Sequence, residues 1–452
     1  MSTDIANQEW TKNQKILFRF VFIYFVLQVV PLDWKYYAHF FSIEWSSLHF
    51  KDLFYISRYT PQPIQNYRPD YWGLSTLGEW LVIALLAVLG TVAWTLIEKK
   101  RLNYPLLYYW LRTLVRYRLA IGILAYGFIK LFPLQAPYPS ISNLNTAYGD
   151  FNRWKLFAMS LGIVPGYESF LGFFEVAAGL LLMFRKTATF GTFIIVLFTG
   201  NVFMSNLAYE GGEGIYSLYL ITLALLVLSY DAARLYQLLV LREPTQPTYV
   251  KPVFQNKWIN KGLLGFKALA IFFFVFLYGA KAYATYRQGG YHYPKTKGLA
   301  DAAGIYDVTD FKVNNEEHPY SDTDSTRWQN VVFEKWATIS IKTLKPKLVD
   351  TLLSEEIYTD DYHQDYESAG SGERSYYTYT IDSAKGELHL LNKNLHYPND
   401  KLTLHYSRPD SSHIVLSGLV SGGDSVSVVL NKINKKYLLK EAAQGRSKAL
   451  KL

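Results

Sequence analysis

The chain has 452 residues and a formal net charge of +9, with 17% aromatic residues, only 18% charged residues and no cysteine. The missing cysteines exclude disulfides, thiolate metal sites, iron–sulfur clusters and cysteine nucleophiles. The first part is apolar and aromatic, and the second is polar and rich in turns. This pattern predicts a helical membrane domain at 1–286, a linker at 287–300, a soluble domain at 301–440 and a basic tail at 441–452.

The apolar part contains about seven segments long enough to cross a bilayer. They are Ile16–Leu32, Glu79–Ile97, Leu111–Phe132, Ile163–Phe184, Thr187–Leu207, Gly214–Tyr230 and Gly262–Tyr283. The stretch 33–78 between the first two is predicted to be a loop on the outer side. Its first aromatic residues, Trp34, Tyr36 and Tyr37, suit an anchor at the membrane surface.

Charges between these segments predict the orientation. Lys and Arg gather at the N-terminus and in the connections after the second, fourth and sixth segments, whereas the other connections are mixed or acidic. The positive-inside rule places the basic connections in the cytoplasm. An odd number of spans then puts the soluble domain outside. We therefore expect a bacterial inner-membrane protein surrounded by the lipid bilayer, with a cytoplasmic N-terminus and a periplasmic C-terminal domain. The excess positive charge is read as this topology signal, and no nucleic-acid partner is expected.

From Asp301 onward, apolar and polar residues alternate with period two. The predicted strands are Gly304–Phe311, Ser375–Asp382, Gly386–Asn392, Lys401–Ser407, His413–Val420 and Asp424–Leu430. Tight turns rich in Gly, Pro, Asp and Ser separate the later ones. The fold class is therefore a polytopic α-helical membrane bundle followed by an all-β antiparallel barrel or sandwich.

Two glutamates lie inside the fourth apolar segment. Glu168 and Glu175 are seven residues apart and alternate with Gly172 and Gly179, so all four share one helix face. Glycines allow a neighbouring helix to approach closely. The acidic stripe is therefore predicted to face protein and not lipid.

Depth along the helices suggests partners for these carboxylates. Counting about 1.5 Å per residue from Ile163 and from Pro133 pairs Lys130 with Glu168 and Arg118 with Glu175. Glu175 and Arg118 are the catalytic candidates. The ligand-binding candidates are Glu168, Lys130, Asn201 and Thr199. Intramembrane charges are commonly functional, but the pairs could also serve only to fix helix packing.

At these residues the sequence resembles the DoxX family. The motifs are "RLAIGILAYGFIKLF" at 118–132 and "EVAAGLLLMFRK" at 175–186, with further similarity in "GNVFMSNLAYE" and "LSYDAARL". The resemblance covers 111–235 and implies a DoxX-like four-helix core there. It extends by architecture to large Bacteroidetes-type members that carry extra helices and a C-terminal soluble domain. It implies a membrane subunit associated with quinone or redox chemistry.

Three functions remain open at this point. The first is a quinone-associated subunit of an oxidoreductase that acts through Arg/Glu pairs and has a redox partner. The second is non-enzymatic binding or transport of a lipophilic or weakly acidic small molecule. The third is a scaffold that presents the β-domain to a periplasmic protein. None of the nine histidines lies in a predicted span. We therefore expect no haem, and any electron carrier must be a bound quinone or belong to a partner. No covalent cofactor and no metal site are expected.

Overall fold

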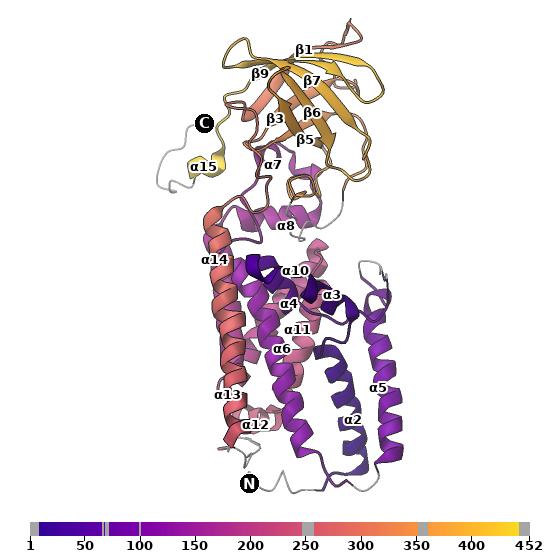
Figure 1. The fold of residues 1–452 in the computed structure, drawn as a ribbon, viewed down its shortest axis with the longest axis vertical. Coiled ribbons are helices and arrows are strands. Elements are labelled where there is room, and N and C mark those ends of the chain that lie inside the picture. The colour runs from indigo at the N-terminus through magenta and orange to yellow at the C-terminus, as the bar shows by residue number, and fades with distance from the viewer. Residues whose placement is uncertain are drawn as a thin grey trace. The chain divides into compact units, whose positions relative to one another are not determined.

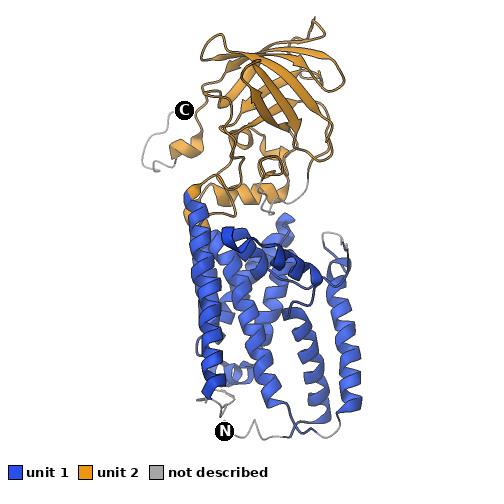
Figure 2. Cartoon of the chain, in the orientation of Figure 1, with its two compact units in different colours: residues 1–132, 169–287 blue, residues 133–168, 288–452 orange. Residues whose placement is uncertain are grey.

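The computed structural model describes residues 9–65, 67, 72–98, 101–245, 257–350 and 360–442. The chain forms two compact units (Figures 1 and 2). The helical unit comprises residues 1–132 and 169–287, and the barrel unit comprises 133–168 and 288–452. The segment 133–168, which the sequence assigns to the membrane domain, thus belongs to the barrel unit. Most of the predicted basic tail, from 443 onward, lies outside the described residues.

The helical unit consists of helices that range from 5 residues in α12 to 27 residues in α6 (Figure 1). They are α2 (Lys12–Val29), α3 (Trp34–Ser42), α4 (Phe50–Ser57), α5 (Gly78–Ile97), α6 (Pro105–Leu131), α9 (Pro165–Leu182), α10 (Ala188–Tyr209), α11 (Gly214–Ser229), α12 (Ala232–Tyr236), α13 (Lys257–Ile271) and α14 (Tyr278–Gln288). Helix α2 packs on α5 and α6, and α11 packs on α6 and α10. Helix α6 is therefore central to the unit.

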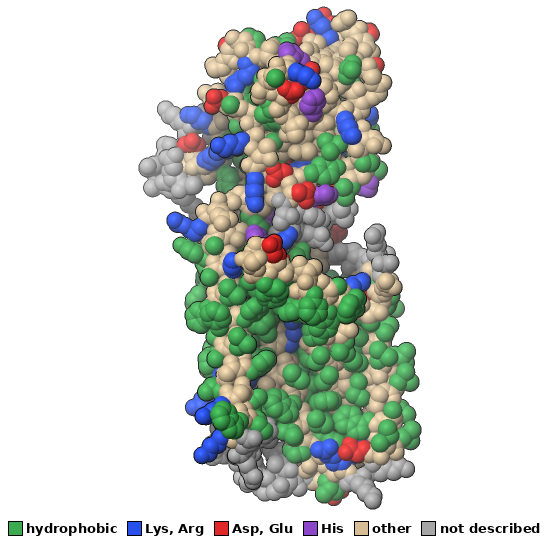
Figure 3. All heavy atoms as spheres, viewed as in Figure 1, with side chains coloured by type: hydrophobic (Ala, Val, Ile, Leu, Met, Phe, Trp, Pro, Cys, Tyr) green, Lys and Arg blue, Asp and Glu red, His purple; other side chains and the backbone are tan. Residues whose placement is uncertain are grey.

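Several of these helices are long and apolar enough to cross a membrane, and hydrophobic side chains cover much of the visible face of this unit (Figure 3). Among the described residues there are four such spans: Lys12–Ser42, Ser75–Ile97, Ala188–Tyr209 and Lys257–Gln288. Two bent pairs, Arg153–Gly162 with Pro165–Leu182 and Gly214–Ser229 with Ala232–Leu241, raise the number to six if each is one span. The seven predicted spans are thus supported only in part. Helix α6 carries Arg112, Arg116, Arg118 and Lys130, more charge than an isolated span tolerates.

The described residues of the predicted outer loop 33–78 include two α-helices, α3 and α4. Helix α4 buries Phe50, Leu53 and Phe54, and the Phe54 ring lies 5.2 Å from that of Tyr126 on α6. The apolar face of α4 therefore folds back onto the bundle, and its backbone comes within reach of α6 side chains.

The barrel unit contains a closed antiparallel β-barrel, which resolves the choice between barrel and sandwich. Its strands are β1 (Gly304–Val313), β2 (Glu316–Glu317), β3 (Trp328–Phe333), β4 (Thr338–Thr343), β5 (Arg374–Asp382), β6 (Glu387–Asn392), β7 (Lys401–Ser407), β8 (His413–Leu419) and β9 (Ser425–Lys432). From β3 to β9 each strand pairs with the next, β3 pairs with β1, and β9 pairs back with β1. The short β2 pairs with β1. The predicted strands are confirmed with small shifts at their ends.

Apolar side chains fill the interior of the barrel. Alternate residues of each strand point inward, as in Leu388 and Leu390 of β6 or Leu402 and Leu404 of β7, and all are buried. Aromatic rings such as Tyr306 take up the centre together with these leucines. The described interior is thus a packed core that stabilises the barrel.

Two further helices, α7 (Ile141–Leu144) and α8 (Arg153–Gly162), belong to the barrel unit. Glu334, in the turn between β3 and β4, accepts hydrogen bonds from the backbone N–H groups of Ile141 and Ser142 and from the Ser142 hydroxyl. The Ser142 hydroxyl also accepts a hydrogen bond from Ser340 on β4. This buried carboxyl therefore attaches α7 to the barrel at the β3–β4 turn.

Glu334 is expected to make stability depend on pH. Burial, reinforced by the charge of Glu367, raises the pKa of Glu334 from 4.5 to about 7. The folded protein then binds this proton more tightly than the unfolded chain, so its contribution to stability is full below pH 4.5 and is lost as the pH rises to 7. The loss should reach roughly 3 kcal/mol. Thermal unfolding of wild type and Glu334→Gln at pH 5 and pH 8 measures it. The variant should show a smaller decrease in Tm, and equal decreases would contradict the prediction.

Candidate functional site

Lys130 and Glu175 form a buried ion pair between α6 and α9. Lys130 Nζ lies 2.6 Å from Glu175 Oε1, and both side chains are less than a tenth exposed. Among the described residues, Glu175 Oε2 is buried without a hydrogen-bond partner. The second oxygen is therefore available to a further proton donor.

Glycines determine how closely these two helices approach. A Cβ atom on Gly172 would lie 2.1 Å from the backbone nitrogen of Leu131, and one on Gly127 would lie 2.9 Å from that of Val176. A side chain at either position would push the backbones apart. The prediction that the small, acidic stripe of α9 faces protein is confirmed, since Glu168 and Glu175 are both buried.

The predicted pairing of the charges is wrong. Lys130 pairs with Glu175 and not with Glu168, and Arg118 is not the partner of Glu175. The depth count started α9 at Ile163, whereas α8 and α9 meet there at an angle of 94°. The glycine contacts set Gly172 beside Leu131, which displaces the register by roughly two helical turns from the count.

Arg118 instead holds the segment that follows α4. Its Nη2 donates hydrogen bonds to the carbonyl oxygens of Ser57 and Tyr59, at 2.7 and 2.6 Å. Its guanidinium also lies over the Tyr59 ring, 5.3 Å from the centroid. A buried guanidinium that satisfies backbone carbonyls in this way fixes the course of the chain around Tyr59.

Glu168 lies in the barrel unit, in the first turn of α9. Its Oε1 accepts hydrogen bonds from the backbone N–H groups of Gln135 and Ala136. These bonds stabilise the chain just after α6, and the binding role of Glu168 stays a prediction.

The two candidates on α10 differ in placement. Thr199 is buried, and its hydroxyl has no hydrogen-bond partner among the described residues. Asn201 is exposed, so the prediction that it lines the interior is wrong. Two residues along a helix rotate the side chain by about 200°, which turns Asn201 away when Thr199 faces inward.

Two tyrosines that were not among the predicted site residues lie near the ion pair. Lys130 Nζ is 5.9 Å from the ring centroid of Tyr126, and the Tyr126 ring is 5.2 Å from that of Tyr216 on α11. The Tyr216 hydroxyl is buried without a hydrogen-bond partner among the described residues. Arg58, which is ion-paired with Glu213, lies over the Tyr216 ring at 5.6 Å from its centroid.

Tyr216 also lines a pocket of about 570 Å3 in the helical unit. Its wall is formed by α3, the end of α4, the chain beyond it and the starts of α5 and α11. The aromatic and basic residues on this wall include Tyr36, Tyr55, Tyr59, Tyr216, His39 and Arg58. Such a mixture of flat rings and hydrogen-bond donors suits a small ring compound with polar substituents.

Helix α3 forms part of the wall of this pocket and is itself largely exposed on the surface of the unit. Tyr36 and His39 line the pocket, whereas Trp34, Tyr37 and Phe41 form an exposed stripe at the spacing of one helix face. Trp34 is 76% and Phe41 74% exposed. Aromatic stripes of this kind are typical of helices that lie in the interface of a membrane.

No protein-family model, curated protein or solved structure matches the chain. What the site can do chemically therefore follows from its own residues. Ring contacts lead from the pocket through Tyr216 and Tyr126 to the ammonium group of Lys130, which is paired with Glu175. These groups can hold and exchange protons next to a cavity that accepts a ring compound.

Proposed function

We propose that the chain is a DoxX-like integral membrane protein that binds a quinone-class lipophile in the tyrosine-lined pocket. It would act as the membrane subunit of a redox system, with the Lys130–Glu175 pair as its proton-exchanging centre. The observation that carries the proposal is this ion pair, which is buried among membrane-type helices and lies near the pocket through the ring contacts of Tyr126 and Tyr216.

The energetics of a buried pair support a functional role. A buried ion pair is frequently less stabilising than apolar side chains of similar size, so packing alone gives little reason for one. In the apolar interior of the bundle, ionisable side chains typically mark a pathway for protons or ligands. The Lys130–Glu175 pair therefore fits a functional centre better than a packing device.

Proton exchange is the chemistry that a quinone requires from its site. Reduction of a quinone to a quinol takes up two electrons and two protons. In this proposal the electrons come from a redox-protein partner, and the protons pass along Tyr216, Tyr126, Lys130 and Glu175. The basic and phenolic groups of the pocket, such as His39 and Tyr36, would bind the carbonyl oxygens of the ring.

The position of α3 fits entry from the bilayer. With Trp34 and Phe41 in the headgroup layer, the pocket wall formed by Tyr36 and His39 would lie at the same depth. We place the segment 33–78 on the periplasmic side of the inner membrane, in accord with the positive-inside rule, and by the same rule the C-terminal barrel is periplasmic. A carrier in which the barrel receives the molecule is less well supported, because apolar side chains fill the barrel.

The test is to identify the bound molecule. Three proteins are purified from bacterial membranes in mild detergent: wild type, the pocket variant Tyr36→Ala/His39→Ala and the control Asn201→Ala. Each is extracted with organic solvent and analysed by mass spectrometry. We expect a quinone in wild type and control, and at least about tenfold less in the pocket variant, because two of its binding groups are lost.

Three other outcomes would contradict the proposal. Equal quinone in all three proteins would mean that it is carried by the detergent micelle or bound elsewhere. A different lipophile that depends on the pocket would favour the carrier. An empty wild-type protein would favour a scaffold that presents the barrel to a protein partner.

A further inference from the structure

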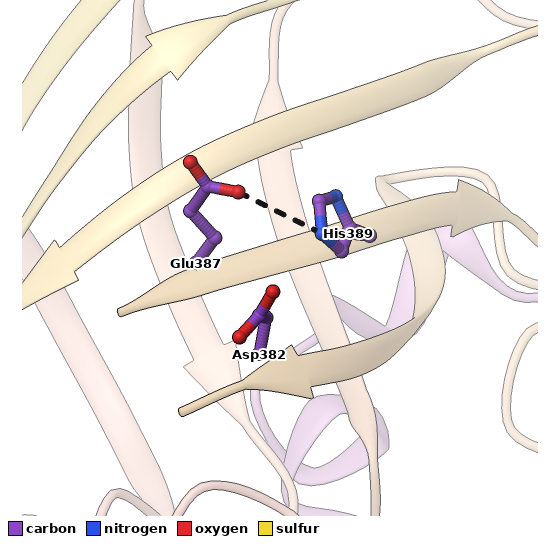
Figure 4. A group of neighbouring side chains, drawn as sticks. All are labelled: Asp382, Glu387 and His389. Atoms are coloured by element: carbon purple, nitrogen blue, oxygen red, sulfur yellow. Dashed lines mark ion pairs between the residues drawn. The ribbon is translucent and has the colours of Figure 1, made fainter. Parts of the chain in front are cut away.

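We propose that the outer face of the β5–β6 hairpin binds a divalent transition-metal ion, with Zn²⁺ the best fit, through Asp382, Glu387 and His389. One donor atom from each of these residues lies within 4.8 Å of the other two. Figure 4 shows the three side chains gathered at the end of the hairpin. The site belongs to the barrel unit and does not depend on the function proposed for the helical unit.

Strand pairing positions the three donors. Asp382 is directly opposite Glu387 in the β5–β6 ladder, so their side chains lie on the same face of the sheet. His389 is two residues beyond Glu387 and shares that face. The intervening Leu388 points into the barrel core and is fully buried, which holds the register of the hairpin. The donor set is thus fixed by the fold and not by a mobile loop.

The orientation of each donor suits metal binding. Asp382 Oδ1 accepts hydrogen bonds from the backbone N–H groups of Ala384 and Lys385, which leaves Oδ2 for a ligand. His389 Nε2 lies 3.8 Å from Glu387 Oε2, and its Nδ1 lies 3.5 Å from Thr403 Oγ1. If Nδ1 carries the proton, Nε2 presents its lone pair to the metal, the arrangement that is usual for histidine ligands.

Distances and charges are compatible with a small divalent ion. Ligand atoms around tetrahedral zinc lie about 3.3–3.6 Å apart, given bond lengths of about 2.0–2.2 Å. A modest side-chain rotation therefore brings this group to binding distance. The two carboxylates balance the charge of the ion. Without metal, Lys385 Nζ lies 3.9 Å from Asp382 Oδ2, but this exposed lysine is free to move away.

The ligand types favour zinc over calcium or magnesium. An imidazole ligand suits Zn²⁺ and neighbouring transition metals, whereas Ca²⁺ and Mg²⁺ prefer sets of oxygen ligands. Three protein ligands leave a fourth position for water, as in zinc sites that are not purely structural.

The experiment uses the full chain, without an affinity tag, in detergent and stripped of metal. Isothermal titration with ZnCl₂ measures affinity and stoichiometry, and Tm is followed with Zn²⁺, Ca²⁺ or Mg²⁺. The variants are Glu387→Gln and His389→Ala. The control is His413→Ala, which removes a partly exposed histidine of the same barrel that also lies beside an aspartate. In that pair, His413 Nδ1 is 2.8 Å from Asp410 Oδ2.

We expect one zinc per chain in wild type and His413→Ala, and binding at least about tenfold weaker in the other two variants. Zinc at one hundred times Kd should raise Tm by about 5 °C, because it binds only the folded hairpin. Calcium and magnesium should leave Tm unchanged. The proposal would be overturned if wild type bound no stoichiometric zinc, or if Glu387→Gln and His389→Ala bound zinc as tightly as wild type.

Discussion

Replacing Lys130 with methionine is expected to lower the free energy of unfolding of the helical unit by about 3–5 kcal/mol. The substitution leaves the carboxylate of Glu175 buried without the ammonium group 2.6 Å away. A charge in such a place cannot be rehydrated without opening the contact between α6 and α9. Thermal unfolding of the purified protein in one detergent, followed by tryptophan fluorescence, measures the effect.

The double variant Lys130→Met/Glu175→Leu separates packing from chemistry. Without either charge, the contact should regain most of the lost stability, since apolar side chains of similar size pack well there. The same variant should lose proton exchange with the bound molecule. The matched control is Lys15→Met on α2, whose partner Glu9 lies 3.9 Å away and is largely exposed. It should change stability by less than about 1 kcal/mol. A single variant as stable as the control would contradict the prediction.

Replacing Arg118 with methionine is the second large effect that we expect. The guanidinium donates to the carbonyls of Ser57 and Tyr59, and hydrogen bonds from charged donors are worth about 1.5–3 kcal/mol each. We expect a loss of about 3 kcal/mol in unfolding free energy. Because Tyr59 lines the pocket, the amount of bound molecule should fall at the same time.

The variant Arg118→Lys distinguishes the loss of stability from the loss of bound molecule. Lysine keeps the charge but cannot reach both carbonyls with the fixed geometry of a guanidinium. It should recover part of the stability and little of the binding. The control is Arg101→Met, which breaks a partly exposed ion pair with Glu98 and should leave both properties nearly unchanged. Full binding in Arg118→Met would show that the pocket does not depend on this anchor.

Local patterns predicted much of the architecture. The apolar segments coincide with helices, as in Gly214–Tyr230 against α11. The alternating stretch Lys401–Ser407 is β7 residue for residue. Strands β3 and β4 were not predicted, because parts of both their faces are buried and their residues do not alternate between apolar and polar. Val331–Phe333 in β3 is an example. Where both faces of a strand are covered, the alternation of apolar and polar residues disappears.

The sequence by itself determined which residues could not face lipid or water. Glu168, Glu175, Arg118 and Lys130 are all buried within protein, as their cost in an apolar medium requires. The small-residue stripe of α9 likewise indicated a close helix contact, and Gly172 makes it. These are properties of single helices, and the periodicity of a helix exposes them without knowledge of its neighbours.

Only the tertiary structure decided the partners. Which charge meets Glu175 depends on the register between α6 and α9, and the backbone contact at Gly172 sets it after a bend that the hydropathy pattern does not reveal. That Arg118 binds backbone carbonyls depends on α4 folding back onto α6. The group of Asp382, Glu387 and His389 likewise exists only because a hairpin places two strands side by side. Contacts between residues distant in sequence result from packing across elements, and the local sequence pattern carries no record of them.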